Sequence, residues 1–371
     1  METTVRTKDW KQLTHKLGPS FAKNVDQNDA EGRFAHENYA LLKSEKFFSA
    51  LIPTELGGGG VTYNEMCNII RIMAHYCGST ALAFSMHQHL VATTVWKYKH
   101  KNEGAETLRR IAKDQLTLVS TGAKDWLGSN GELIQTEGGY LLSAKKHFAS
   151  QSVVGDIAVT SSIFKDLEGK ESVLHFSTPL QQKGVTFLDD WNTLGMRATG
   201  SQTIVFNKVF IPKGAIALKR DGNEFHPVWN VVLTVAMPLI MSAYIGLAQK
   251  AEALAIESAK RRSQNHTNYS IGQLHTTFLG CKVQWNAMLE MANNLDFKPL
   301  SRNTADTLAY KTNVSNLAKE TVSQALEIIG GQGFYKEHEI ERLFRDVQAS
   351  TFHPLPKWNQ YEFTGKQIIG N

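Results

Sequence analysis

The chain has 371 residues, of which 42% are hydrophobic, so it can bury a large core, and its length predicts two or three domains. Lys and Arg exceed Asp and Glu by 40 to 35, and the net charge of +5 forms no dense basic cluster, which argues against a nucleic-acid-binding surface. The cysteines, Cys67, Cys77 and Cys281, lie far apart without metal-ligand spacing, which argues against a disulfide framework or a metal site and favours a reducing compartment.

The N-terminus lacks the apolar core of a signal peptide, so we expect a cytoplasmic protein. Residues 231–248 contain no charge over 18 positions, which is the lower limit for a membrane span. Thr234, Pro238, Ser242 and Gly246 weaken that interpretation, and a helix buried on all sides has the same pattern. We therefore expect a core helix and no membrane span.

The pattern is helical from Trp10 to about Ala112. It is clearest over residues 64–77, where apolar side chains at i, i+3, i+4 and i+7 form one core-facing stripe. These side chains are Met66, Ile69, Ile70 and Met73. Residues 51–60 interrupt the helices with a proline and four consecutive glycines, which predicts a loop. A glycine run can cradle phosphate, but this one lacks the Lys-Ser/Thr of a P-loop, so a plain connector is favoured.

Two histidines, His87 and His89, stand in an otherwise small and apolar stretch. At i and i+2 they cannot share one face of a helix, so a two-histidine metal site is not expected here. At least one of them should point inward. A buried histidine is usually a hydrogen-bonded core residue, and the alternative is a catalytic role for His87.

Around Leu116 the apolar period changes from 3.6 to 2 and β-branched residues become more frequent, which marks a domain boundary. Six short strands are predicted. They cover residues 116–121, 139–148, 157–163, 173–177, 185–188 and 203–211. Such closely spaced strands predict an antiparallel sandwich or barrel. The helical period returns at about His226, so we divide the chain into a helical domain at 1–115, a β domain at 116–222 and a helical domain at 223–371.

The stretch 189–212 begins with Trp191 and Thr193 in a turn-forming run with two glycines, and it continues as a strand that ends at Pro212. A flat aromatic side chain beside small, flexible residues suits a planar ligand. The alternative is a solvent-facing loop between strands.

Several runs resemble motifs of the acyl-CoA dehydrogenase superfamily. The run 191–201, Trp-Asn-Thr-Leu-Gly-Met-Arg-Ala-Thr-Gly-Ser, resembles its signature segment, and residues 330–333 with 341–346 resemble its Gly-Gly-x-Gly…Glu-Arg-Leu-x-Arg-Asp block. The resemblance covers nearly the whole chain. It implies an α+β multidomain fold with an N-terminal helical domain, a middle antiparallel β-barrel or sandwich domain and a C-terminal four-helix-bundle domain.

The resemblance also implies a flavin cofactor, FAD or alternatively FMN. Ser150 occupies the position of a hydroxyl that contacts the reactive edge of the flavin ring, while Trp191 and Thr193 belong to the segment that walls it. The register places Arg262 on the arginine that holds the flavin pyrophosphate. Residues 119–129 resemble a degenerate form of another flavin and substrate loop.

In the superfamily the block Gly330, Gly331, Gln332 and Gly333 approaches the flavin of a neighbouring subunit. The resemblance therefore implies a homotetramer or homodimer.

An acyl-CoA dehydrogenase needs a glutamate base near the α-carbon of its substrate, and the two usual positions for it lack one here. The first position holds His353, followed by Pro354, and the second lies within residues 225–251, which contain no acidic residue.

Three functions stay open. In the first, Glu362 supplies the base and the chain is an FAD-dependent, acyl-CoA-dehydrogenase-like oxidoreductase that passes hydride to flavin N5 and electrons to an electron-transfer flavoprotein. In the second, His353, supported by Ser150 and His87, serves a monooxygenase that uses reduced flavin from a flavin reductase, because a histidine that titrates near neutrality can accept and donate a proton. The third is a catalytically silent flavin-binding or acyl-ligand-binding protein. The first is our main prediction, since Arg262 and the glycine block would grip a full FAD.

Overall fold

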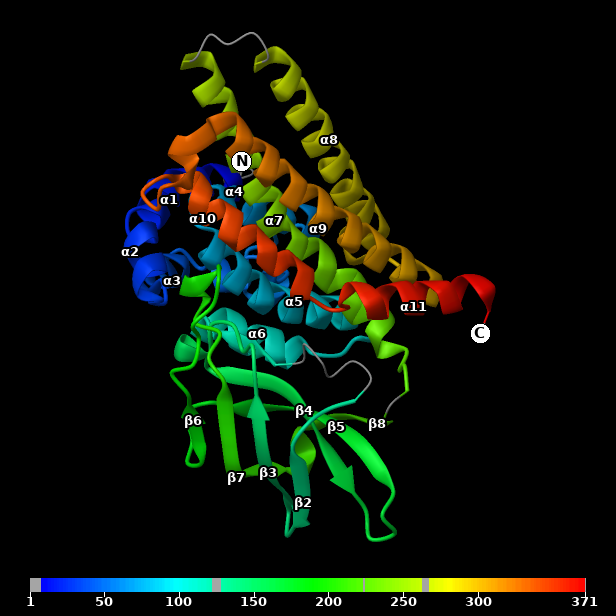
Figure 1. Cartoon of the computed structure of the whole chain (residues 1–371). Coiled ribbons are helices and arrows are strands. Elements are labelled where there is room, and N and C mark those ends of the chain that lie inside the picture. The colour runs from blue at the N-terminus through cyan, green and yellow to red at the C-terminus, as the bar shows by residue number, and fades with distance from the viewer. Residues whose placement is uncertain (1–7, 122–127, 223, 262–266, 371) are drawn as a thin grey trace, which may run out of the picture.

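The computed structural model has a helical N-terminal region, a central β domain and a helical C-terminal domain, which confirms the predicted fold class (Figure 1). The structure describes residues 8–121, 128–222, 224–261 and 267–370. The helices of the N-terminal region are α1 (Trp10–Ala22), α2 (Val25–Glu31), α3 (His36–Ser44), α4 (Tyr63–Tyr76), α5 (Gly78–Lys101) and α6 (Ala105–Asp114).

The predicted stripe lies on α4, where Met66, Ile69, Ile70 and Met73 are all fully buried. The hydroxyl of Thr62 caps this helix by accepting the backbone N–H of Glu65. The stripe packs against the long C-terminal helix described below, which joins the N-terminal region to the C-terminal domain in one core.

The glycine loop before α4 folds back on itself. The amide groups of Gly57, Gly58, Gly59 and Gly60 all donate to carbonyl groups of residues 49–54. A Cβ atom added at Gly58 would lie 2.0 Å from the Ile52 carbonyl oxygen, so the tight turn requires glycine there. Because these amides are already satisfied, the loop is a connector and not a phosphate cradle, as the sequence predicts.

The β domain is one eight-stranded sheet. Its strands are β1 (Leu118–Ser120), β2 (Glu132–Thr136), β3 (Gly139–Lys146), β4 (Ile157–Lys165), β5 (Glu171–Pro179), β6 (Val185–Phe187), β7 (Ile204–Pro212) and β8 (Ile216–Asp221). The order is β6-β7-β3-β2-β4-β5-β8, and β1 pairs with β4.

Most pairs in this sheet are antiparallel, as predicted, but β1 and β2 both run parallel to β4. The first half of β4 pairs with β1 through Ile157 and the second half with β2 through Ile163, so the two short strands follow one another along one edge of β4. The sequence prediction missed β2 and β8. In β2 only Leu133 is buried, so the strand has no alternating pattern.

The C-terminal domain is built around α7 (Val228–Arg261), the helix at the centre of Figure 1. The other helices are α8 (Thr267–Ala292), α9 (Ser301–Ile329), α10 (Glu339–Val347) and α11 (Lys357–Ile369). Helices α4, α5, α8 and α9 surround α7. Within the described ranges, α7 alone is long and apolar enough to span a membrane, yet 94% of its most apolar stretch is buried inside the protein. The predicted core helix is therefore confirmed.

Candidate functional site

The segment between β6 and β7, residues 188–203, contacts all three parts of the chain. Gly195 lies so close to α10 that an added Cβ atom would be 2.3 Å from the Arg345 carbonyl oxygen. The Arg197 guanidinium donates to the carbonyl of Asp29 in α2, at 2.6 Å. The segment thus binds the C-terminal domain on one side and the N-terminal region on the other, which fixes its position relative to the β domain.

A buried carboxylate, Asp346 on α10, holds the middle of this segment by accepting the backbone N–H of Met196. Burial raises the pKa of Asp346 to about 6, against the lowering effects of the Met196 amide and the nearby Arg342. Asp346 is the last residue of the Arg-Asp pair noted in the sequence, and its role is to hold the backbone in place.

A row of hydroxyl groups runs from this segment to Ser150, which follows β3. The Ser150 Oγ atom lies 2.9 Å from Ser201 Oγ, and Ser201 Oγ lies 2.7 Å from Thr199 Oγ1. Thr199 in turn donates to the Met196 carbonyl at 2.9 Å. Ser150 is only 7% exposed, so its hydroxyl is held in a defined position by protein groups.

Beside this row, Phe148 and Trp191 form an aromatic pair. Phe148 is 57% exposed, and its ring meets Trp191 edge to face with 6.0 Å between ring centroids. The Trp191 indole N–H donates to the Met196 carbonyl, which fixes the ring. The exposed Phe148 ring and the half-buried Trp191 ring lie next to buried hydroxyl groups, an arrangement that would suit a planar ligand with a polar edge, such as a flavin ring. The sequence prediction missed Phe148, although it is an aromatic residue two positions before Ser150.

Thr193, another predicted cofactor residue, is half-buried and donates its hydroxyl to the Gly195 carbonyl at 3.0 Å. That hydrogen bond stabilises the turn of the segment. Thr193 therefore shapes the wall of the candidate site through the backbone.

His353, which follows the short helix η8 (Gln348–Phe352), forms a hydrogen bond with a fully buried tyrosine. Its Nε2 atom lies 2.5 Å from the Tyr244 hydroxyl on α7. Burial lowers the pKa of His353 to about 3, with a smaller contribution from Lys311, so the imidazole is neutral throughout the physiological range. This direction differs from the titration near neutrality that the sequence analysis expected for His353.

Two side chains contact the His353 turn, Lys311 and Tyr244, and the sequence prediction missed both. Lys311 on α9 donates to the His353 carbonyl at 2.8 Å and to the Leu355 carbonyl at 3.1 Å. Burial raises the pKa of Tyr244 well above its usual value, and the charge of Asp346 raises it further. Tyr244 therefore stays a neutral phenol between His353 and the carboxylate that holds Met196.

His87, predicted as a possible catalytic residue, has a structural role instead. Its Nδ1 atom accepts the backbone N–H of Leu118 at 3.1 Å, so Nε2 carries the proton and donates to the Phe48 carbonyl at 2.8 Å. Both ring nitrogens are used, and burial lowers its pKa to about 4. The ring joins the N-terminal region to β1 and has no free nitrogen for proton transfer.

Glu362 is placed on the exposed face of α11, where it forms an ion pair with Lys366 at 2.7 Å. Its side chain is 64% exposed, and the hydrogen bond from Lys366 lowers its pKa. Exposure to water and the ion pair with Lys366 both stabilise the Glu362 carboxylate, which makes it a weak base for removing a proton from carbon. The similarity of residues 361–364 to the Tyr-Glu-Gly-Thr run does not put this carboxylate beside Tyr244.

The predicted glycine block forms the short helix η7 (Gly330–Phe334). Gly330 has φ 72° and ψ −158°, a conformation open to glycine, and Gly333 is buried against Leu326. Gly331 and Gln332 are exposed, which leaves this loop available to a ligand or a second subunit. Arg262, the predicted pyrophosphate arginine, lies outside the described residues, as do residues 122–127 of the second loop.

Two large apolar side chains beside this block, Phe334 and Tyr335, are 86% and 68% exposed. We predict that they lie in a subunit interface, because exposed apolar groups of this size favour association. Replacing both with serine should shift the protein to smaller species in analytical ultracentrifugation. Serine at Leu167, which is fully exposed in the β4–β5 turn, is the matched control and should leave the mass unchanged. An unchanged mass in the double variant would place the interface elsewhere.

The buried histidines predict how stability depends on pH. Burial lowers the pKa of five histidines from 6.5, to about 4 in four of them and to about 3 in the fifth. They are His75, His87, His89, His175 and, lowest, His353. The unfolded chain therefore binds more protons than the folded chain below about pH 6.5, and acidification favours unfolding down to about pH 4.

Asp346 acts in the opposite direction, because its raised pKa adds stability as the pH falls through about 6. Since five histidines oppose one aspartate, the melting temperature should decrease between pH 6.5 and 4. A melting temperature that stays constant or rises over this range would contradict the burial of these rings.

The sequence matches models of two protein domains. Residues 17–115 match the acyl-CoA dehydrogenase N-terminal domain, and residues 228–353 match the acyl-CoA dehydrogenase C-terminal domain. An amino sugar nitrososynthase of Streptomyces peucetius is 24% identical over 381 residues, which cover 96% of this chain and 92% of that protein.

Two solved structures are closely similar in fold. The nitrososynthase of Micromonospora carbonacea var. africana has a TM-score of 0.90 at 24% identity and covers 99% of this chain and 98% of that one. KijD3 in complex with FMN and dTDP-3-amino-2,3,6-trideoxy-4-keto-3-methyl-D-glucose has a TM-score of 0.87 at 25% identity, covering 99% of this chain and 95% of that one.

A β domain set between two helical parts, with matches to both helical domains, defines a flavin-dependent oxidoreductase fold. The chain belongs to the acyl-CoA dehydrogenase superfamily, which includes nitrososynthases and other flavin-dependent monooxygenases of the same fold.

Proposed function

We propose that this protein is a monooxygenase that uses reduced flavin and O2 to oxygenate the nitrogen of an amine. The main support is the neutral pair of His353 and Tyr244. His353 occupies the sequence position at which a dehydrogenase of the superfamily has its glutamate base. This favours the second of the three functions considered from the sequence over acyl-CoA oxidation.

Acyl-CoA oxidation requires a carboxylate that removes an α-proton while hydride leaves the neighbouring carbon. Residues 225–251 contain no acidic residue, and Glu362 is exposed and paired with Lys366. A neutral imidazole with a pKa of about 3 is too weak a base to replace a carboxylate in that step. Dehydrogenation requires a carboxylate base, which is missing here, whereas oxygen transfer from reduced flavin does not require one.

Ser150, Phe148 and Trp191 are the residues that would hold the flavin ring. When bound in its reduced form, a flavin supplies the two electrons that convert one atom of O2 to water while the other is transferred to the substrate. Ser150, fixed by Ser201, offers a hydroxyl to a polar edge of the ring, and Phe148 and Trp191 exclude water from its face. The pair of Tyr244 and His353 offers a hydrogen-bond donor and acceptor without net charge.

An amine is the substrate class that the relatives support. One is named as an amino sugar nitrososynthase, and another is seen in complex with an amino sugar nucleotide. An amine nitrogen is nucleophilic when unprotonated, and a neutral site does not stabilise its protonated form. We therefore propose a nucleotide-linked amino sugar as the first substrate to test, with a separate flavin reductase as electron source.

The test measures the mass of the product. The full chain is incubated with FMN or FAD, a flavin reductase, NADH, O2 and a dTDP-linked amino sugar. A product heavier by oxygen, whose added atom comes from labelled O2, supports the proposal. In parallel, the oxidised holoprotein is mixed anaerobically with acyl-CoAs of several chain lengths. Bleaching of the flavin by an acyl-CoA would overturn the proposal in favour of dehydrogenation, and inactivity with a panel of amines together with no bleaching would favour a flavin-binding protein without catalysis.

A further inference from the structure

A small cavity of about 80 Å³ lies between α9, η8 and the start of α11, and three lysines line it. Lys311 and Lys319 come from α9, and Lys357 is the first residue of α11. The rest of the lining is polar and consists of hydroxyl groups, including that of Thr351, and one asparagine. None of the described residues that line this cavity is acidic.

The lysine ammonium groups have N–H donors to spare. Lys311 is 2% exposed and uses two donors on the carbonyls of His353 and Leu355, which leaves one of its three. Lys319 donates to the Thr351 hydroxyl at 3.0 Å, which leaves two. Lys357 is exposed at the rim, close to the ring of Tyr361.

The charges of the three lysines are not balanced by neighbouring acids. In the part of the chain that the structure describes, none of the ion pairs includes Lys311, Lys319 or Lys357. Burial lowers the pKa of Lys311 to about 8, and the charge of Lys319 lowers it further. Burial and Lys357 likewise lower the pKa of Lys319. A cluster of like charges is unfavourable by itself, so an anion between the lysines would relieve their repulsion.

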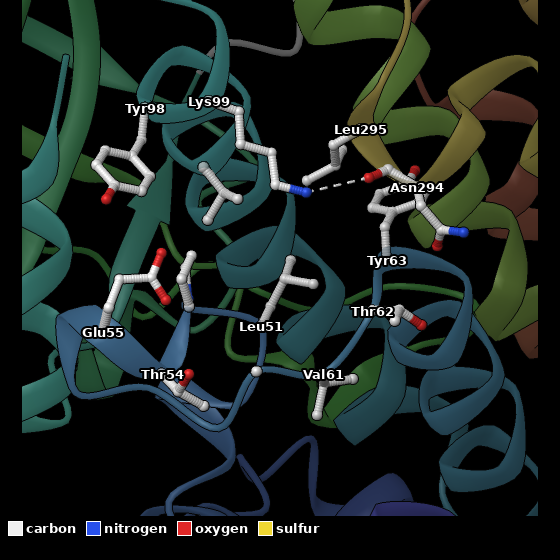
Figure 2. Close-up of a pocket in the computed structure, with 13 residues that line it drawn as sticks. Leu51, Thr54, Glu55, Val61, Thr62, Tyr63, Tyr98, Lys99, Asn294 and Leu295 are labelled. Atoms are coloured by element: carbon white, nitrogen blue, oxygen red, sulfur yellow. Dashed lines mark hydrogen bonds between the residues drawn. The ribbon is translucent and has the colours of Figure 1, made fainter. Parts of the chain in front are cut away.

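Another cavity, of about 290 Å³, has a different lining (Figure 2). Its walls include apolar side chains, the Glu55 carboxylate and the Lys99 ammonium, which donates to the Asn294 carbonyl. Opposite charges are both present there, so it shows no preference for an anion. The lysine cavity differs because its charged groups all have the same sign.

We propose that the lysine cavity binds one phosphate group. A cavity volume of about 10–15 Å³ accommodates one water molecule, which has one non-hydrogen atom. The volume of about 80 Å³ is therefore enough for the five non-hydrogen atoms of a phosphate group. Ammonium and hydroxyl donors around a small cavity match the acceptor oxygens of a phosphate. The phosphate can belong to a flavin nucleotide, to a nucleotide-linked substrate or to the free ion.

The site has a direct connection to the His353 pair, since Lys311 lines the cavity and also holds the His353 carbonyl. A phosphate there would contact the lysine that positions the turn of His353. The assignment itself rests on the lysine cluster and does not depend on the reaction proposed above, so binding, not turnover, is the measured quantity.

The experiment measures binding to the full chain by calorimetry, with the double variant Lys319→Gln, Lys357→Gln, which keeps the buried Lys311. The probes are inorganic phosphate, FMN against riboflavin, and dTDP against thymidine. Lys282→Gln, which removes one charge from the exposed face of α8, is the control and should bind like the original protein.

At least one phosphate-bearing probe should bind about tenfold or more weakly to the double variant, because each lysine lost removes charge-assisted hydrogen bonds. Riboflavin and thymidine should bind the two proteins equally. A loss for FMN alone identifies the flavin phosphate, a loss for dTDP alone identifies the substrate, and a loss for inorganic phosphate identifies the free ion. Unchanged binding of all three phosphate probes, or an equal loss in Lys282→Gln, would overturn the assignment.

Discussion

Replacing His353 with alanine is expected to lower kcat/KM for oxygen transfer by about 100-fold or more, the usual contribution of a positioned proton-transfer or hydrogen-bonding group. The substitution removes the partner of the buried Tyr244 hydroxyl, which is then left unsatisfied. Steady-state kinetics with reduced flavin supplied in excess measures the effect, and flavin binding should change much less than turnover.

Two variants separate this role from its alternatives. Tyr244→Phe removes only the hydroxyl and should lower kcat/KM by a smaller factor than His353→Ala does. Glu362→Gln should leave kcat/KM within about twofold, because surface ion pairs such as that with Lys366 contribute little. Loss of activity in Glu362→Gln with retained activity in His353→Ala would reverse the assignment and restore the carboxylate as the base.

Replacing Gly195 with alanine is expected to reduce both stability and flavin affinity. The added methyl group would lie 2.3 Å from the Arg345 carbonyl oxygen and 2.6 Å from the Asp346 amide nitrogen, both of which are backbone atoms and cannot rotate away. We expect a loss of about 1–3 kcal/mol in the free energy of unfolding, the usual cost of overpacking. Urea unfolding measures it, and a flavin titration measures the affinity.

Gly214→Ala is the matched control, because no atom lies within 4 Å of its added methyl group. It should unfold at the same urea concentration as the original protein, or at a slightly higher one. Equal stability of the two alanine variants would mean that the segment after β6 can move away from α10 without cost.

The sequence predicts the large elements well, because their patterns are local. The stripe on α4 is buried as its spacing requires, and the uncharged run in α7 is the core helix. The parallel pairing of β1 and β2 with β4 could not be predicted, because register and direction depend on contacts between distant residues. The short β2 has one buried side chain, and so too little pattern to detect.

The candidate site is predicted in part. Ser150 contacts Ser201 and Trp191 contacts Phe148, so the two motif residues both adjoin the segment between β6 and β7, and their role in holding a flavin stays a prediction. Tyr244 and Lys311 carry no motif and reach His353 only through the packing of α7 and α9. The sequence favoured a core role for a histidine here and left catalysis by His87 open as the alternative, because its two backbone partners, from Phe48 and Leu118, cannot be seen in a linear sequence. The exposed position of Glu362 on α11 could not be predicted, because a shifted motif match says nothing about which helix face a side chain occupies.

The closely packed segment between β6 and β7 has a consequence for chimaeric proteins. Its contacts with the Asp29 carbonyl and with Asp346 each join residues that domain exchange would take from different parents. A β domain grafted from a relative should function only if its loop fits the host's α2 and α10. A crossover in the exposed β4–β5 hairpin, where Asp166 closes its own turn, keeps Met196 and Asp346 in one parent, so only the contact of Arg197 with Asp29 then has to match.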